Sequence, residues 1–278
     1  MSVSSQVPSS PSRSAVVTAL RASGCVFAED EADLLLATAR TPKELAAMVE
    51  RRVAGLPLEH VLGWAEFCGL RMAVEPGVFV PRRRTEFLVR RAADLARRGV
   101  SGAGTVVLDL CCGSGAVGAA LAALLEEAGA PVELYAVDID PAAVRCARRN
   151  IAAAGGRVYL GDLYEPLPAG LRGRVDVLLA NAPYVPSQEL GLLPREARAH
   201  EPRVALDGGP DGLGVQRRVI AGAPRWLAPG GRLLVETSRR QAPRTALAIT
   251  RSGLVPRVEM SDELDATVVV ATRPAPGD

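Results

Sequence analysis

The stretch "LDLCCGSGAVG", residues 108–118, decides the fold of this chain. Alternating apolar residues run into a glycine-rich turn, and small apolar residues follow it, which predicts a strand, a tight turn and the start of a helix. Gly113 and Gly115 would let the backbone come close to a ligand, and the helix N-terminus would offer free N–H groups. In open sheets of this kind, ligands bind beyond the carboxyl ends of the strands.

The same alternation of strand and helix continues to the C-terminus. Strands are expected at 105–111, 132–140, 157–162, 175–181 and 231–237, with helices near 115–128, 141–153, 213–227 and 241–251. Two last apolar stretches, 254–260 and 266–273, lack a helix between them and predict an antiparallel pair. The expected fold class is therefore α/β, a Rossmann-like sheet of seven strands whose last pair is antiparallel.

The N-terminal third has a different pattern. Residues 1–14 are half serine and predict a disordered tail. Residues 15–62 read as a small helical domain, and 63–80 alternate around two glycines, which favours a hairpin linker. The large domain would then cover 81–278, beginning with an amphipathic helix near Pro81.

Composition excludes several classes of protein. The net charge of +2 speaks against a general polyanion binder, and no apolar run is long enough to cross a bilayer. Five cysteines without Cys/His ligand spacing predict no metal site and no disulfide framework, which fits the reducing cytoplasm.

One basic segment stands out: residues 82–98 hold seven arginines and two acids. It reads as a solvated helix face, or as a docking surface for an acidic protein or ribosomal RNA.

Two acids, Asp109 and Asp138, are expected beside the glycine-rich turn, and the ligand that they would bind is not decided by the turn alone. Gly113, Gly115 and Gly118 spell G-x-G-x-x-G, and Asp138 follows 20 residues later, so the dinucleotide fingerprint of a nicotinamide or flavin site is met. Asp109, however, lies inside the strand, where an acid suits a cationic ligand. S-adenosylmethionine carries an ammonium and a sulfonium group, and the sequence favours it.

The fourth expected strand ends in an unusual way. In "VDVLLANAPYVP", residues 175–186, five apolar residues in six positions run into Asn181-Ala182-Pro183-Tyr184. A planar –NH2 group is a poor nucleophile, but its two N–H groups can be held by the Asn181 side-chain oxygen and the carbonyl of residue 182. The Tyr184 ring can stack on the flat group. Such a site favours methyl transfer to an amide or a nucleobase through positioning and desolvation.

Taken together, these stretches resemble the HemK/PrmC-type protein-glutamine methyltransferases. Residues 59–89 are similar to the family's linker and its Pro-Arg-x-x-Thr-Glu segment, and 109–121 to its S-adenosylmethionine loop. Residues 136–150 look like its ribose-binding strand end, "NAPY" matches its Asn-Pro-Pro-Tyr signature, and 200–213 match the loop that follows.

The resemblance implies an enzyme that methylates a glutamine side-chain amide in peptide chain release factors. It further implies a monomer in the cytoplasm with a protein substrate, no metal and no nucleic-acid partner beyond a ribosomal contact. The Asn-Ala-Pro-Tyr segment would be catalytic, and Thr85 and Glu86 would bind substrate at the pocket mouth together with Asn181 and Tyr184. The implied cofactor residues are Asp109, Cys111, Cys112, Gly113, Ser114, Gly115, Asp138, Ile139, Asp162, Leu163 and Asn181.

Four departures from the family pattern bear on these expectations. Cys111 and Cys112 stand where glycine and a small residue are usual, so the first turn is expected to avoid positive φ. Ala182 replaces a proline, and Arg83 and Arg84 replace a proline and an acid. The helical domain is also shorter by about a helix pair between residues 40 and 41, which predicts a changed or looser substrate choice.

Three alternatives remain open from the sequence. A nucleic-acid methyltransferase acting on exocyclic amines would use the same clamp, although no target-recognition domain or basic groove is visible. A nicotinamide-dependent oxidoreductase fits the glycine fingerprint alone. A binding module without enzymatic activity is the third.

Overall fold

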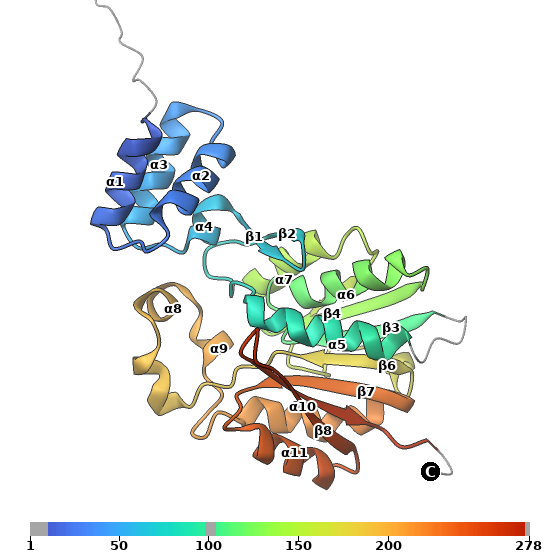
Figure 1. Ribbon diagram of the computed structural model, residues 1–278. Coiled ribbons are helices and arrows are strands. Elements are labelled where there is room, and N and C mark those ends of the chain that lie inside the picture. Colours follow the sequence, from blue (N-terminus) through green and yellow to red (C-terminus); the bar gives the residue numbers. More distant parts are fainter. Residues whose placement is uncertain (1–10, 98–103, 276–278) are drawn as a thin grey trace, which may run out of the picture.

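The computed structural model describes residues 11–97 and 104–275 (Figure 1). The N-terminal part of this described chain holds a bundle of four helices: α1 (Arg13–Ala22), α2 (Ala28–Thr38), α3 (Pro42–Val53) and α4 (Leu58–Leu62). A hairpin follows, made of β1 (Trp64–Phe67) and β2 (Leu70–Ala73), and then the short η1 (Arg83–Thr85) leads into α5 (Glu86–Arg97). The bundle has an apolar core of its own, which includes Val16, Leu20, Leu35 and Leu45.

Within the described residues, the large domain is built on one seven-stranded sheet in the order β5-β4-β3-β6-β7-β9-β8. Its strands are β3 (Thr105–Leu110), β4 (Val132–Asp138), β5 (Arg157–Leu160), β6 (Val175–Ala180), β7 (Leu227–Thr237), β8 (Val255–Ser261) and β9 (Ala266–Thr272). The first five are parallel, and β9 pairs antiparallel with both β7 and β8. The predicted fold class and its antiparallel last pair are confirmed.

Helices cover both faces of this sheet (Figure 1). On one face α5 packs with α6 (Ala116–Glu127) and α7 (Pro141–Asn150), and on the other lie α10 (Gly214–Trp226) and α11 (Ala242–Arg251). Neighbouring residues of one strand divide between the two cores: Val107 faces the first and Leu108 the second. This follows from the two-residue period of a strand, and it explains why these strands are apolar throughout.

The strand order reverses beside β3, and this fixes where a ligand can bind. The chain runs from β3 outward to β4 and β5, and then returns to β6 on the other side of β3. Leu110 pairs with Ala180, so the turn after β3 and the Asn-Ala-Pro-Tyr segment leave the sheet at the same height. Ligands in open α/β sheets bind at such a switch point.

Two expected boundaries need correction. The tail was predicted to extend to residue 14, but α1 begins at Arg13 because the Ser12 hydroxyl caps it by accepting the Ala15 N–H at 3.3 Å; residues 1–10 lie outside the described residues. Strand β7 begins at Leu227 instead of residue 231. Its pairing with β6 shifts register between Val175 and Val177, and this irregularity accommodates the Pro-Gly-Gly sequence.

Three short helices, η3 (Ser187–Leu192), α8 (Arg195–His200) and α9 (Arg203–Leu206), follow the Asn-Ala-Pro-Tyr segment. Arg52 of α3 joins this segment to the helical bundle, because its guanidinium pairs with Glu31 at 2.6 Å and with Glu196 of α8 at 3.3 Å. A second ion pair joins Arg82 to Glu201, at the end of α8. These ion pairs therefore join α8 to the helical bundle and to the segment that precedes η1.

Candidate functional site

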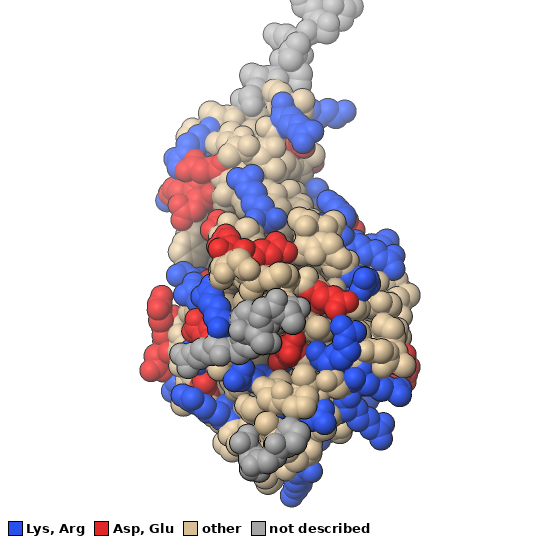
Figure 2. All heavy atoms as spheres, turned by 90° about the vertical axis from the view of Figure 1, so that its right-hand side faces the viewer, with Lys and Arg blue, Asp and Glu red and all other residues tan. Residues whose placement is uncertain are grey.

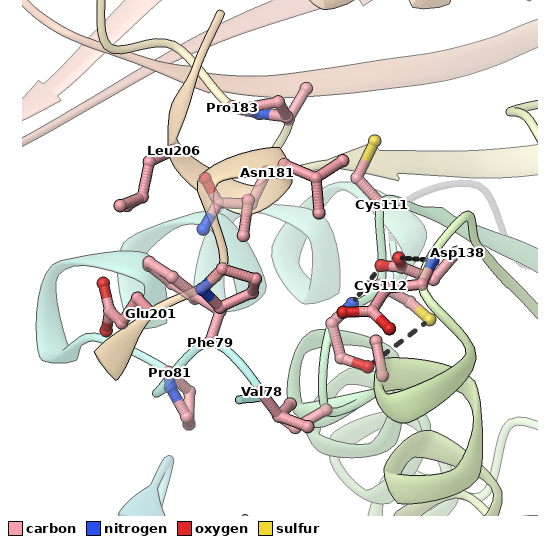
Figure 3. Close-up of a pocket in the computed structure, with 18 of the residues that line it drawn as sticks. Val78, Phe79, Pro81, Cys111, Cys112, Asp138, Asn181, Pro183, Glu201 and Leu206 are labelled. Atoms are coloured by element: carbon pink, nitrogen blue, oxygen red, sulfur yellow. Dashed lines mark hydrogen bonds between the residues drawn. The ribbon is translucent and has the colours of Figure 1, made fainter. Parts of the chain in front are cut away.

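A cavity of about 640 Å³ lies at the carboxyl ends of β3, β4 and β6. This volume lies within the usual range for small-molecule sites. Figure 3 shows Cys111, Cys112 and Asp138 at one end, and Asn181, Phe79, Leu206 and Glu201 at the other. The remaining walls come from the linker, α8 and α9, and include Val78, Pro81, Pro194, Ala197 and Val204.

The glycine-rich turn forms the floor at one end. Cys111 has φ of 56°, so the expectation that this turn avoids positive φ is wrong. A non-glycine residue in this region is strained by roughly 1–2 kcal/mol, and such strain gathers at functional sites. Burial also raises the pKa of the Cys111 thiol, which keeps it protonated and unreactive.

The three glycines of the fingerprint serve different purposes. A Cβ on Gly113 would meet nothing within 4 Å, so this position leaves space on the ligand side. A Cβ on Gly115 would lie 3.0 Å from Ala147, so glycine is needed there for the packing of α7. Gly118 leaves room for the Asp109 carboxylate, whose Oδ2 would lie 3.1 Å from an added Cβ.

Asp109 is a buried acid in the wall of the cavity. Its Oδ2 accepts the Gly118 N–H at 3.0 Å. Burial raises the pKa of Asp109 to about 7, the charge of Asp138 adds to the increase, and the Gly118 hydrogen bond opposes it. A cation in the cavity would favour the ionised carboxylate, which agrees with the role predicted for this residue.

Asp138 closes β4 and holds the turn in place. Its Oδ2 accepts the Gly113 N–H at 2.8 Å, and its Oδ1 accepts the Asp140 N–H at 2.9 Å. Burial raises the pKa of Asp138, and these two hydrogen bonds act against the increase. Each carboxylate oxygen keeps a further lone pair, so the group can still accept hydrogen bonds from a ligand hydroxyl.

Ile139, Asp162 and Leu163 also line the cavity. Asp162 binds an arginine that the sequence did not indicate. Ile139 is 53% exposed at the cavity edge, where its apolar side chain is available to a ligand. Asp162 accepts a hydrogen bond from Arg218 of α10 at 2.6 Å, and Leu163 takes a positive φ of 49°. Arg218 lies 56 residues from its partner, so no local pattern could have found it.

At the other end, Gln241 and the loop at 207–214 hold the backbone of Tyr184 and Val185. The carbonyl of Tyr184 accepts from Gln241 Nε2 at 2.9 Å, and that of Val185 from the Gly208 N–H at 2.9 Å. Among the described residues, no hydrogen bond occupies the carbonyl of Ala182. This carbonyl and the Asn181 side chain are the two groups that the sequence assigned to an –NH2 clamp.

Asn181 is oriented by Thr85. The Asn181 Nδ2 donates to Thr85 Oγ1 over 3.4 Å, which leaves the amide oxygen for a donor in the cavity. The Tyr184 hydroxyl donates to Glu236 Oε1 at 3.3 Å, and the Arg84 guanidinium lies 5.9 Å from the ring centroid. Burial raises the pKa of Tyr184, so its ring serves as a neutral wall of the site.

Two of the predicted substrate-binding residues are placed differently from the expectation. Thr85 lines the cavity, but it is only 1% exposed and lies beside Asn181, at the inner wall instead of the mouth. Glu86 is not part of the cavity wall: it accepts the Cys68 N–H at 3.1 Å and pairs with Arg90 at 2.8 Å. It therefore stabilises the hairpin turn, where Cys68 has a positive φ.

The basic segment is not the uniformly solvated helix face that its composition suggests. Arg82 and Arg84 pair with the buried Glu201 and Glu236, and the largely buried Arg91 pairs with Glu259. Figure 2 shows one face of the molecule, on which acidic groups lie among the basic ones. Much of this positive charge is neutralised within the fold, which weakens the docking interpretation.

In the part of the chain that the structure describes, no group of three or more His, Cys, Asp or Glu side chains could hold a metal ion. None of the described helices is long and apolar enough to cross a membrane.

Comparisons with known proteins agree with this geometry. A family model described as "Methyltransferase domain" matches residues 101–267. A release factor glutamine methyltransferase from Geobacter sulfurreducens is 42% identical over 217 residues, which cover 76% of this chain and 72% of that protein. A 4-amino-L-phenylalanine/4-methylamino-L-phenylalanine methyltransferase from Streptomyces pristinaespiralis is 37% identical over 221 residues, 78% of this chain and 73% of that protein. A solved methyltransferase from Pyrococcus furiosus shares the fold, with a TM-score of 0.50 at 17% identity, over 74% of this chain and 90% of that one.

Proposed function

The chain belongs to the release factor glutamine methyltransferase family, and on that premise we propose that it methylates the side-chain amide nitrogen of a glutamine in a peptide chain release factor. One observation carries the proposal. A single cavity joins the glycine-rich turn and Asp138 to the Asn181 amide oxygen and the unoccupied Ala182 carbonyl. An –NH2 group held by these two acceptors would face the cofactor end.

The residues at that end fit S-adenosylmethionine, the cofactor of this fold. S-adenosylmethionine supplies an electrophilic methyl group on a sulfonium centre. Asp138 would hold the ribose hydroxyls and Ile139 would cover the base, while Asp109 offers negative charge to the cationic part. The open space at Gly113 leaves room for close approach of the backbone. The turn from Cys111 to Gly115, with Asp162 and Leu163, completes this binding site.

The fingerprint glycines therefore serve S-adenosylmethionine, and the dinucleotide alternative is not retained. Calorimetric titration tests this directly. S-adenosylhomocysteine should bind and NAD should not; tight binding of NAD would contradict the assignment.

This chain's own residues would supply much of the rate enhancement by positioning the substrate amide. The Asn181 oxygen and the Ala182 carbonyl each accept one N–H of the glutamine amide, which directs its nitrogen toward the methyl group. The Tyr184 ring and Pro183 exclude water from the flat amide. Glu201 is a carboxyl group at this end of the cavity and pairs with Arg82. The reaction needs no base before attack, because the proton can leave the product afterwards.

The proposed function also includes a binding partner and a cellular location. We assign substrate recognition to the helical bundle with its linker, since α4 contributes Glu59 and the linker contributes Val78 and Phe79 to the cavity wall. The substrate is a protein, and the enzyme would act as a monomer in the cytoplasm, where its five cysteines stay thiols. A ribosomal contact would be the extent of its nucleic-acid binding.

Methyl transfer from labelled S-adenosylmethionine to three acceptors tests the proposal. A purified release factor with a Gly-Gly-Gln loop is the expected substrate, and mass spectrometry should place the methyl group on that glutamine. 4-Aminophenylalanine and single-stranded DNA are the controls, because both present planar amines to the same clamp. Methylation of either control in place of the release factor would contradict the proposed substrate while leaving the clamp intact.

A further inference from the structure

A buried glutamine next to the Asn-Ala-Pro-Tyr segment uses both of its side-chain donors within the fold. Gln241, directly before α11, is 5% exposed and is not part of the cavity wall. Its Nε2 donates to the carbonyl of Tyr184 at 2.9 Å and to that of Asp211 at 3.2 Å. Its Oε1 accepts the Ser238 hydroxyl at 2.6 Å. Because a carbonyl oxygen can only accept, these partners determine which way the Gln241 amide points.

This hydrogen bond holds one side of the –NH2 clamp. On the other side, β6 ends at Ala180 and is held by its pairing with β3. Between these two fixed points, the ring of Pro183 locks one more backbone dihedral angle. The peptide group that carries the Ala182 carbonyl therefore has little freedom to turn as long as the Tyr184 carbonyl stays on Gln241.

The loop after α9 supports the same segment with backbone alone. A Cβ on Gly212 would lie 2.3 Å from the Tyr184 carbonyl oxygen and 2.4 Å from Gln241 Nε2. A Cβ on Gly208 would lie 2.7 Å from the Pro183 carbonyl oxygen. Such close packing leaves no space for a side chain at either glycine. The loop and Gln241 therefore form one continuous support behind the clamp.

Resting on the proposed function, we propose that Gln241 is a positioning residue for methyl transfer. It holds the Tyr184 carbonyl, and in this way it keeps the Ala182 carbonyl directed at the acceptor –NH2 group. Gly212 provides the space that this hydrogen bond needs. A misplacement of about 1 Å between reacting groups can cost on the order of 100-fold in rate, so a support that does not touch the substrate can still determine turnover.

The first test removes the two donors at nearly constant side-chain length. Gln241→Met has no donor and adds no charge. Gln216→Met is the matched control, because Gln216 is also buried and its Nε2 donates to a backbone carbonyl, that of Glu236 in β7, at 3.0 Å. That contact lies outside the Asn-Ala-Pro-Tyr segment. The measurements are kcat and KM for the release factor, S-adenosylhomocysteine affinity and the thermal midpoint.

We expect Gln241→Met to lower kcat by roughly tenfold or more, and Gln216→Met to stay within about threefold of wild type. The thermal midpoint should fall in both variants, because each loses a buried hydrogen bond. S-adenosylhomocysteine affinity should change by less than about twofold, since neither glutamine lines the cavity. Equal kcat for wild type and Gln241→Met overturns the positioning role, as does an equal loss of kcat in both variants or a loss confined to KM or to cofactor affinity.

The second test uses two glycines of the same loop. Gly209 and Gly212 have φ of 89° and 75°, so alanine is strained at both positions. A Cβ on Gly209 would meet nothing within 4 Å, whereas one on Gly212 would displace the Tyr184 carbonyl or Gln241. Gly212→Ala should therefore lower kcat by roughly tenfold or more, and Gly209→Ala should stay within about threefold of wild type. Equal kcat for the two alanine variants overturns the proposal.

Two provisions keep these tests decisive. If Gln241→Met or Gly212→Ala shows no thermal transition, Gln241→Asn replaces it, because the shorter amide keeps its chemistry but no longer reaches the Tyr184 carbonyl; full kcat of this variant overturns the proposal. A wild type without activity on the glutamine substrate contradicts the proposed function itself. An active wild type whose Gln241 and Gly212 variants keep full kcat contradicts this inference alone.

Discussion

Replacing Asp109 by asparagine tests the electrostatics of the cofactor end. The side chain is 1% exposed, and its Oδ2 accepts the Gly118 N–H at 3.0 Å. Asparagine keeps this acceptor and the shape of the group, but it cannot ionise. The substitution therefore isolates the free energy of placing a negative charge at this position.

The expected magnitude follows from the pKa of Asp109, which burial raises from 3.8 to about 7. This difference corresponds to about 4 kcal/mol once the group is ionised in both states. Because the folded pKa is the higher one, the folded protein keeps a proton that the unfolded chain has already lost. Wild-type stability should fall as pH rises from about 4 to about 7 and then level off, with about 2 kcal/mol of the loss between pH 5 and pH 7.

Denaturant unfolding of wild type and Asp109→Asn at pH 5, 6 and 7 measures this effect. The difference in unfolding free energy should shift in favour of the variant by about 2 kcal/mol over this range, because other groups titrate equally in both proteins. If the difference in unfolding free energy between the two proteins is the same at pH 5 and pH 7, the pKa of Asp109 is not raised in the folded protein. S-adenosylmethionine should also release a proton from wild type near pH 7, and less from the variant, as measured by calorimetry in buffers of different ionisation enthalpy.

Four further predictions concern single positions and the short helical bundle. Ala182→Pro should keep turnover within about tenfold, because Pro183 already restricts residue 182. It should also add up to ~1 kcal/mol of stability, measured by denaturant unfolding. Asp138→Ala should weaken S-adenosylhomocysteine binding by about 1–3 kcal/mol in a calorimetric titration, because ribose hydroxyls lose a charged acceptor; unchanged affinity would exclude that contact. Cys111→Gly should relieve up to ~1 kcal/mol of backbone strain, seen as a higher thermal midpoint, since glycine takes a φ of 56° freely but costs more to order. The short bundle should loosen substrate choice, and efficient methylation of the release factor at ordinary enzyme concentration would show that the missing segment is dispensable.

The fold could be predicted from the sequence because the patterns that decide it are local. The strand, turn and helix of residues 108–118 appear as predicted, and the alternation of elements after them determined the sheet and its antiparallel last pair. The structure also brings Asp138 and the Asn-Ala-Pro-Tyr segment to one cavity, since both lie at the ends of strands that flank the switch point.

What the sequence could not provide are contacts between distant segments. Thr85 and Asn181 are 96 residues apart, and Arg82 and Glu201 are 119 apart, so neither pairing has a periodic signature. Glu86 was misplaced because a motif position does not say which way a side chain points. The positive φ of Cys111 was missed because propensity disfavours it, and only the surrounding packing forces the residue into it.

In the proposed mechanism, the Asn181 amide holds a glutamine –NH2 group for methyl transfer. The most direct test is the single-turnover rate of release factor methylation by wild type and by Asn181→Ala, with S-adenosylhomocysteine affinity measured on both. We expect a loss on the order of 100-fold in rate with nearly unchanged cofactor affinity, because one positioning contact to the acceptor is removed. Full activity of Asn181→Ala on the glutamine, with the methyl group in the same place, would contradict it.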